Sequence, residues 1–177
     1  MILTRADLPK LLISMDLPLI GAEIGVADGS FSRDLLVGGF TKLYSIDFWG
    51  RLPQTGDGGY NTEWHNANYA SALTKLTPFP GSVILRGKSA DMAKEISDNE
   101  LSLLYIDGDH SYKGVLSDLV AYYPKVRTNG IIAGHDYLNR DYGVYDAVAD
   151  FCLQYSFTPI IIPENSPTDS SFYLVKK

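Results

Sequence analysis

The sequence feature that most limits the fold is a pair of apolar runs, residues 103–112 and 130–136, that each contain acidic and imidazole side chains. These polar residues are Asp107 and Asp109 in the first run and His135 and Asp136 in the second. In an open α/β sheet, parallel strands end at one edge, and ligands bind in the crevice outside those carboxyl ends. We therefore expect the two groups to converge there. Carboxylates and imidazole at such an edge suit a hard divalent cation or proton transfer, which indicates a reaction site.

Apolar runs alternate with helical patterns along the chain. The runs are rich in Ile, Leu and Val and mostly lack polar alternation, which is typical of parallel strands covered on both faces. Strands are predicted at residues 19–26, 42–47, 82–86, 101–107 and 130–134. Helical spacing predicts helices at residues 5–15, 30–36, 63–76, 111–126 and 142–155.

The C-terminal part of the chain has a different pattern. Two strand-like runs, residues 157–162 and 171–176, flank a connector with turn residues and no helical pattern, so they are predicted to pair antiparallel. The prediction for residues 1–177 is therefore a single α/β domain. Its sheet is doubly wound, Rossmann-like and mostly parallel, with seven strands, an antiparallel C-terminal hairpin and helices on both faces.

Composition and charge exclude several classes of protein. The formal net charge is −6 without clusters of Lys or Arg, so we expect no nucleic-acid partner. Residues 1–21 are too interrupted by charges and prolines to span a bilayer or to act as a signal peptide. Cys152 is the single cysteine, lies in a helical apolar pattern and is predicted to be buried. We expect a cytoplasmic enzyme with no membrane partner.

The turn after the first strand has features of a nucleotide site. Gly25 and Gly29 allow tight turning and close approach of a ligand, although many such turns contain glycine. Asp47 closes the second strand, where it either accepts hydrogen bonds from ribose hydroxyls or is an ordinary solvated strand end. Glu23 lies inside a buried strand, which costs several kcal/mol unless the carboxylate is paired. A cationic ligand group or a backbone donor would pair it.

These motifs together resemble a known enzyme family. The motifs are Glu-x-Gly-x-x-x-Gly at residues 23–29, the acid at Asp47, Ile-Asp-Gly-Asp-His-Ser-Tyr at 106–112, Asn-Gly at 129–130 and Gly-His-Asp-Tyr at 134–137. They are similar to class I S-adenosylmethionine-dependent methyltransferases. More narrowly, they resemble the small branch related to macrocin-type sugar O-methyltransferases and to the proteins named cephalosporin hydroxylase-like. The resemblance covers nearly the whole chain from about Gly21 and implies a metal-assisted O-methyltransferase for a small hydroxylated acceptor.

The resemblance also implies a role for each matched residue. The residues implied in S-adenosylmethionine binding are Glu23, Gly25, Gly29, Asp47, Phe48, Ser89 and Asp107. The first three would surround the methionine part, Asp47 the ribose, and Phe48 and Ser89 the adenine. In metal-using relatives the carboxylates that match Asp107 and Asp136 hold Mg²⁺. Asp109 would then be the candidate base. Small members of such folds often pair, which by analogy predicts a homodimer.

Several alternatives stay open for single residues. Asp109 can instead cap the following helix, and His135, where relatives often carry Asp, is a metal ligand, a base, or bonded to a neighbour. His110 is predicted to lie at the rim of the site. His65 joins the site only if the glycine-rich residues 50–61 close as a lid rather than form a plain insertion. Residues 137–142 supply Tyr137, Arg140 and Tyr142, which either line an acceptor pocket or lie on the surface.

Three other functions also stay open. The Asp/His group suits a metal-dependent hydrolase, and the cofactor turn suits a non-catalytic cofactor-binding protein. A nicotinamide-dependent oxidoreductase is disfavoured by Ala27 in the turn and by the closing hairpin. The methyl acceptor is open among sugar, phenolic and natural-product hydroxyls, and nitrogen.

Overall fold

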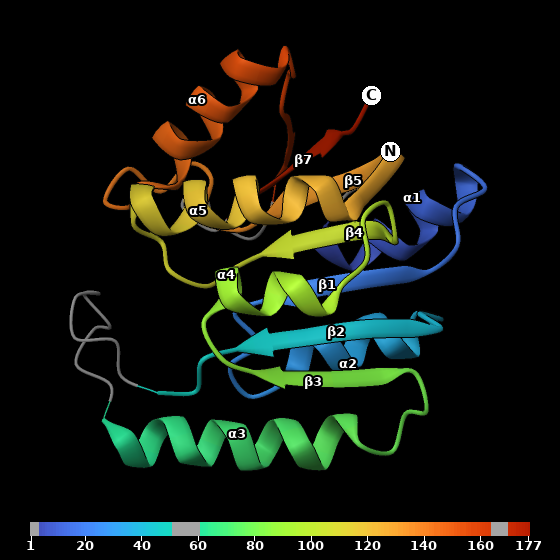
Figure 1. Ribbon diagram of the computed structural model, residues 1–177, viewed down its shortest axis with the longest axis vertical. Helices are drawn as coiled ribbons and strands as arrows, with labels where there is room; N and C mark the ends of the chain where they lie inside the picture. The colour runs from blue at the N-terminus through green and yellow to red at the C-terminus, as the bar shows by residue number, and fades with distance from the viewer. Residues whose placement is uncertain (1–3, 51–60, 164–169) are drawn as a thin grey trace.

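A computed structural model describes residues 4–50, 61–163 and 170–177 of the chain. Within these residues, seven strands form one sheet in the order β3-β2-β1-β4-β5-β7-β6 (Figure 1). The strands are β1 Ile20–Ile24, β2 Lys42–Asp47, β3 Ser82–Arg86, β4 Leu101–Ile106, β5 Val126–Gly134, β6 Ile160–Ile162 and β7 Ser171–Val175. The pairs from β3 to β5 are parallel, and β7 is antiparallel to both β5 and β6. The predicted fold class and hairpin are confirmed.

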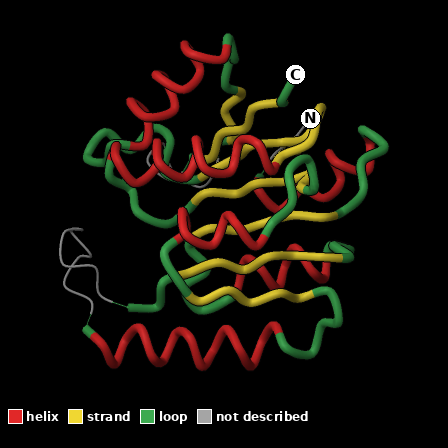
Figure 2. Tube along the Cα trace, in the orientation of Figure 1, coloured by secondary structure: helices red, strands yellow, loops and turns green. Residues whose placement is uncertain are grey.

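Helices cover both faces of the sheet (Figure 2). The helices are η1 Arg5–Asp7, α1 Leu8–Ser14, α2 Ser30–Val37, α3 Thr62–Leu76, α4 Ser89–Met92, η2 Ala93–Glu95, α5 Tyr112–Tyr122, η3 Tyr123–Lys125 and α6 Val144–Tyr155. Helices α1, α2 and α3 pack in one apolar cluster, and α4, α5 and α6 in the other. Among the described residues, no helix is long and apolar enough to cross a membrane.

Strand β4 shows why the central runs lack polar alternation. All of its residues are buried. Leu103 and Tyr105 belong to the cluster under α1 and α2, whereas Leu104 and Ile106 belong to the cluster under α5 and α6. Since each face of the strand meets a layer of helices, both sets of side chains are mainly apolar. Burial of each such side chain stabilises the fold by about 1.5–3 kcal/mol.

The structure differs from the predicted elements at a few boundaries. The predicted helix at residues 111–126 ends as α5 at Tyr122 and continues as a short 3-10 turn, because Pro124 has no backbone N–H to donate. Strand β5 then begins at Val126, earlier than the predicted residue 130. Helix α4 was missed because four residues are too few for a periodic signal. The predicted connector at residues 163–170 lies almost wholly outside the described residues.

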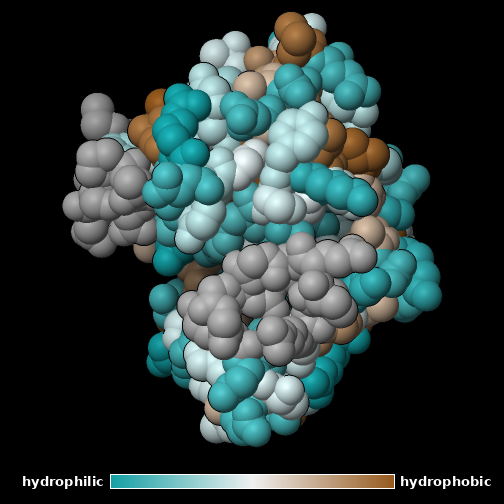
Figure 3. Space-filling view, turned by 90° about the vertical axis from the view of Figure 1, so that its left-hand side faces the viewer, coloured by the Kyte–Doolittle hydropathy of each residue, from teal (hydrophilic) through white to brown (hydrophobic). Residues whose placement is uncertain are grey.

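Backbone hydrogen bonds continue past the ends of the strands and align three loops. Gly25 N donates to Ile46 O at 2.9 Å, Asp107 N to Ile24 O at 2.7 Å, and His135 N to Ile106 O at 3.1 Å. The first residues after β1, β4 and β5 are thereby fixed beside each other at the carboxyl edge. Figure 3 views this edge, and the described surface there is mainly hydrophilic.

Gly25 is predicted to be essential for stability because its turn leaves no room for a side chain. Its φ is +87°, and an added Cβ would lie 2.0 Å from the carbonyl oxygen of Asp107. We expect Gly25→Ala to lower the free energy of unfolding by roughly 2–5 kcal/mol. Urea denaturation measures this change. Gly108→Ala is the matched control, since its Cβ would meet Ile24 at an ordinary 3.4 Å. Equal midpoints for the two variants would contradict this explanation of the turn.

Candidate active site

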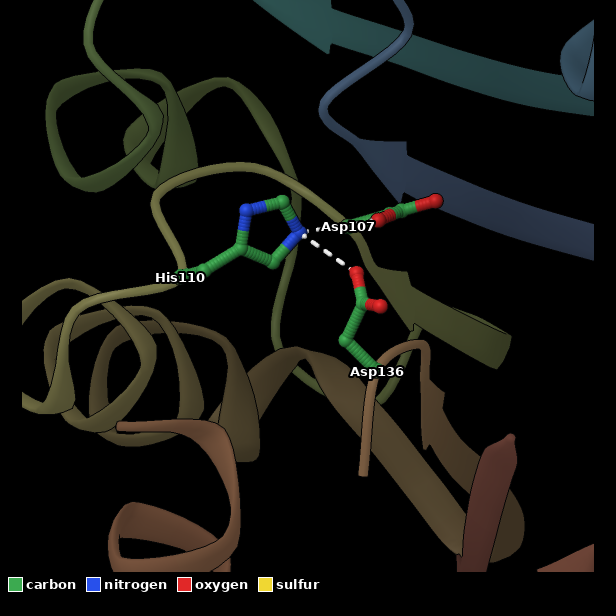
Figure 4. Close-up of side chains that lie close together, drawn as sticks. All are labelled: Asp107, His110 and Asp136. Carbon is green, nitrogen blue, oxygen red and sulfur yellow. Dashed lines mark hydrogen bonds and ion pairs between the residues drawn. The ribbon is translucent and has the colours of Figure 1, made fainter. Parts of the chain in front are cut away.

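Two carboxylates and an imidazole meet where β4 and β5 end (Figure 4). His110 Nε2 lies 3.2 Å from Asp107 Oδ1 and 3.1 Å from Asp136 Oδ2. One ligand atom from each of the three residues lies within 4.8 Å of the others. The structure thus brings together Asp107 and Asp136, as expected from the parallel strand order. We call these three residues the Asp-His-Asp cluster.

His110 lies at the centre of the cluster, so its predicted place at the rim is wrong. Its ring stacks on that of Tyr142, with centroids 4.8 Å apart and planes at 16°. Its carbonyl oxygen accepts a hydrogen bond from Gly143 N at 2.9 Å. The loop before α6 therefore holds His110 in place. The sequence did contain a signal for this position, because His110 follows Asp107 by only three residues and the two side chains can therefore meet.

Asp136 has an unusual backbone conformation that suits its place in the cluster. Its φ is +54°, in the left-handed region that Asp tolerates better than most residues. His135 Nδ1 lies 3.2 Å from Asp136 Oδ2 and 3.9 Å from Asp107 Oδ1. His135 thus borders the cluster from the side of β5.

The charges of the cluster reinforce one another. Burial alone would lower the pKa of His110, but hydrogen bonds to Asp107 and Asp136 outweigh it and raise the pKa to about 9. Burial likewise opposes the charged form of His135, yet Asp136 and Asp107 raise its pKa above the usual value. For Asp136, burial acts to raise the pKa, and the hydrogen bonds from His110 and His135 lower it well below its usual range. These contacts favour the protonated form of His110 between Asp107 and Asp136.

Arg5 contacts the cluster from the N-terminal segment, which the sequence did not indicate. Its Nη1 lies 3.4 Å from Asp107 Oδ2 and 3.4 Å from the Tyr105 hydroxyl. Its guanidinium lies over the ring of Phe31, 4.9 Å from the centroid. Arg5 therefore binds one oxygen of Asp107, while the other oxygen faces His110.

Asp109, the predicted base, holds the turn before α5, and Ser111 is the N-cap of that helix. Asp109 Oδ1 accepts a hydrogen bond from Ser111 N at 2.9 Å, and the Ser111 hydroxyl accepts one from Gly114 N. An added Cβ on Gly114 would lie 2.4 Å from the Asp109 carboxyl carbon. Asp109 is not a member of the cluster, and its role as a base stays a prediction.

Glu23 is buried as the next-to-last residue of β1, close to the candidate cofactor turn. The Ser32 hydroxyl donates a hydrogen bond to Glu23 Oε2 and also contacts the Ser45 hydroxyl at 2.7 Å. Burial raises the pKa of Glu23 to about 8, against the lowering effect of the Ser32 hydrogen bond. The hydrogen-bond partner of this carboxyl is thus the Ser32 hydroxyl of α2, which Ser45 of β2 contacts in turn, whereas the sequence suggested a cationic ligand group or a backbone donor.

Asp47 organises the turn after β1 with both of its oxygens. Oδ2 accepts hydrogen bonds from Val26 N and Ala27 N at 2.9 Å, and Oδ1 accepts one from Trp49 N at 2.7 Å. The Trp49 indole donates in turn to Ala27 O at 2.7 Å. Ala27 has a φ of +47°, so these contacts hold a conformation that a non-glycine residue rarely adopts. Because a carboxylate oxygen has two lone pairs, Asp47 can accept hydrogen bonds in addition to these. Its contact with ribose stays a prediction.

The remaining predicted cofactor residues lie at the same edge. Phe48 follows β2 and is half-buried, and Ser89 begins α4 after β3. The Ser89 hydroxyl donates to Asp118 of α5, a side chain 3% exposed whose pKa burial raises to about 7. Gly29, with φ +83°, lies against Ala72 of α3, where an added Cβ would be 2.9 Å from the Ala72 Cα. Gly25 and Gly29 are thus required by packing, and their contact with a cofactor stays a prediction.

The other candidate side chains are distributed differently. Tyr137 is buried against Phe172 and Tyr145, so it does not lie on the surface, and its place in an acceptor pocket stays a prediction. Arg140 lies over the Tyr145 ring, and Tyr142 is 43% exposed beside His110. His65 lies in α3, outside the cluster. The predicted lid at residues 50–61 is almost entirely outside the described residues.

Residues 22–137 match the model of a family described as a methyltransferase domain. The chain belongs to this family. The matched span runs from β1 to the end of the Asp-His-Asp cluster, so the resemblance to S-adenosylmethionine-dependent methyltransferases is confirmed at the level of the family. The narrower branch stays a prediction.

Individual relatives are distant. The chain is 24% identical over 129 residues to "Uncharacterized protein y4gI" of Sinorhizobium fredii (strain NBRC 101917 / NGR234), covering 70% of this chain but only 13% of that protein. It is similar in fold to the O-methyltransferase NovP, with a TM-score of 0.69, 19% identity and coverage of 97% and 77% of the two chains. It is also similar to the O-methyltransferase TomG from Streptomyces achromogenes, solved in complex with SAM. That TM-score is 0.67, with 13% identity and coverage of 98% and 80%. These structural likenesses show the fold.

The buried Glu23 predicts a pH dependence of stability. The unfolded chain loses this proton near the usual pKa of 4.5, whereas the folded protein keeps it up to about 8. Stability therefore falls as the pH rises between about 5 and 8. We expect Glu23→Gln to lose less stability than the wild type across this range, as measured by the melting temperature. Glu95→Gln, at an exposed carboxyl, should leave the slope unchanged. A wild-type slope in the Glu23 variant would contradict the assignment.

Proposed function

We propose that this protein is an S-adenosylmethionine-dependent O-methyltransferase that acts on a hydroxyl of a small acceptor with the help of a divalent cation. The observation that carries this proposal is the convergence, within a methyltransferase domain, of the β1 turn, Asp47 and the Asp-His-Asp cluster at one sheet edge. The fold likenesses to NovP and to the SAM complex of TomG, both named O-methyltransferases, support it.

The arrangement suits the chemical demands of methyl transfer. The reaction is an in-line displacement, in which the acceptor oxygen bonds to the methyl carbon as the bond from carbon to sulfur breaks. Alignment of these atoms can contribute roughly 7–11 kcal/mol in favourable systems. The β1 turn and Asp47 would bind the cofactor, and the neighbouring cluster would orient the acceptor hydroxyl. The proton of that hydroxyl would pass to His135, whose Nδ1 borders Asp136, or to Asp109.

The donor set of the cluster fits a divalent cation. Asp107 and Asp136 supply carboxylate oxygens, and His110 adds a nitrogen within 4.8 Å of both. Such an ion, when bound, stabilises negative charge on the acceptor oxygen. Arg5 keeps the second oxygen of Asp107 directed away from the cluster.

A metal-dependent hydrolase is the second candidate, because two carboxylates and an imidazole also suit activation of water by a cation. Turnover of ester or phosphate substrates with Mg²⁺ or Mn²⁺ and no methyl donor would favour it. Methyl transfer from labelled S-adenosylmethionine to a panel of sugars and phenols would favour the first proposal. If calorimetric titration detects binding of neither S-adenosylmethionine nor S-adenosylhomocysteine, the methyltransferase proposal is wrong.

Asp47 provides a test of cofactor binding. We expect Asp47→Asn to weaken S-adenosylhomocysteine binding by about tenfold or more in calorimetric titration, because an acceptor of the ribose hydroxyls loses its charge. The melting temperature without ligand monitors the turn that Asp47 holds. Asp98→Asn, at an exposed residue before β4, is the control. Unchanged affinity in Asp47→Asn would contradict the ribose assignment.

Asp136 provides a test of the chemistry. We expect Asp136→Asn to reduce turnover by at least about 100-fold while S-adenosylhomocysteine still binds, because the cluster loses a charged ligand. Parallel assays of His135→Gln and Asp109→Asn identify the base as the residue whose variant loses the acidic limb of the pH profile, which is the fall in rate at low pH where a base is protonated. Wild-type turnover in Asp136→Asn would show that the cluster takes no part in the reaction.

A further inference from the structure

We propose that His110 is the third protein ligand of the cation, and that its nitrogen makes the site select Mn²⁺, Co²⁺ or Zn²⁺ over the Mg²⁺ implied by the resemblance. The inference rests on the proposed cation site at Asp107 and Asp136. It adds a ligand that sits in the turn after β4, at a position that sequence reasoning assigned to the rim.

The positions of the donor atoms support His110 as a ligand. Nε2 of His110 is 3.2 Å from Asp107 Oδ1 and 3.1 Å from Asp136 Oδ2, and Figure 4 shows it directed toward both carboxylates. Two ligands at right angles on one ion, with bonds of about 2.1 Å, are roughly 3 Å apart. The nitrogen therefore already has the spacing of a ligand from each carboxylate. His135 has this spacing from Asp136 but not from Asp107, since its Nδ1 is 3.9 Å from the Asp107 carboxylate.

The supporting contacts fix His110 and Asp107 in this geometry. Tyr142 stacks on the His110 ring, and Gly143 N donates to the His110 carbonyl. An added Cβ on Gly143 would lie 2.1 Å from Tyr112 N, so the loop before α6 is packed tightly on the start of α5. Arg5 binds Asp107 Oδ2 and leaves Oδ1 to face the nitrogen. Ligands held by partners outside the cluster are preorganised for an ion.

The chemistry of the ligands determines which cation the site prefers. Mg²⁺ prefers six oxygen ligands in near-ideal octahedral geometry and retains several waters. Imidazole suits Zn²⁺ and other first-row transition ions, and mixed N/O sets bind these ions more tightly than Mn²⁺ in the usual order of affinity. A site with two carboxylates and one imidazole is thus poorly matched to Mg²⁺. Replacing the imidazole by a third carboxylate would improve that match.

The experiment measures metal binding to the full chain without S-adenosylmethionine. Calorimetric titrations with MgCl₂, MnCl₂ and CoCl₂ compare the wild type with His110→Asp and, as the matched imidazole control, His135→Asn. We expect the wild type to bind Mn²⁺ at least about 100-fold more tightly than Mg²⁺, and His110→Asp to reduce this ratio by about tenfold or more. His135→Asn should keep the wild-type ratio. Circular dichroism checks that the variants are folded.

A spectroscopic readout identifies the ligand directly. Pulsed electron paramagnetic resonance of the Mn²⁺ complex should show coupling to a directly bound imidazole ¹⁴N in the wild type and in His135→Asn, and none in His110→Asp. Coupling that persists in His110→Asp and is lost in His135→Asn would overturn the proposal by assigning the nitrogen to His135. Absence of ¹⁴N coupling in the wild type, equal affinity for Mg²⁺ and Mn²⁺, or no metal binding would also overturn it.

Failure here and failure of the proposed function are distinguishable. Titration with S-adenosylhomocysteine tests the methyltransferase proposal without metal, so a protein that binds the nucleoside but shows no ¹⁴N coupling keeps that function and loses this ligand. A protein that binds Mn²⁺ through nitrogen but binds neither S-adenosylmethionine nor S-adenosylhomocysteine keeps His110 as a ligand and loses the methyl-transfer proposal.

Discussion

The candidate site depends on backbone hydrogen bonds that extend the parallel ladder by one residue past β1, β4 and β5. Gly25, Asp107 and His135 each donate to the last or nearly last carbonyl of a neighbouring strand. This fixes the height of three loops relative to one another. Side chains from segments far apart in sequence can then meet at ligand distance. The absence of a Cβ at Gly25 is part of the same constraint, because the Asp107 carbonyl lies where that atom would be.

Much of this was accessible from sequence because its physical cause is periodic. Unbroken apolar runs followed by acids gave the strands and the convergence of Asp107 and Asp136. The irregular turns were not accessible in the same way. Whether Asp109 or His110 faces the cluster depends on backbone angles after β4, where the sequence has no period to read. Arg5 was missed for a related reason, since its contact with Asp107 joins residues 102 positions apart.

Several acidic groups gather near the carboxyl edge of the sheet. Glu23, Asp47, Asp107 and Asp136 all lie there, and a concentration of like charge is costly unless it is paired or protonated. Several features of the structure reduce this energetic cost. Glu23 keeps its proton, Asp47 accepts backbone N–H groups, and the cluster holds a protonated imidazole with Arg5 beside it. Burial opposes a charged His110, but its hydrogen bonds to Asp107 and Asp136 raise the pKa to about 9.

The negative charge of these acidic side chains affects methyl transfer. S-adenosylmethionine carries a positive charge on sulfur, which a negative edge stabilises in the ground state, and the charge disappears as the methyl group leaves. An edge that only stabilised the sulfonium would therefore slow the reaction, since catalysis requires stronger interaction with the transition state than with the substrate. The cations must act at the acceptor instead. The proposed ion, held by Asp107 and Asp136, would place positive charge beside the acceptor oxygen, where negative charge develops.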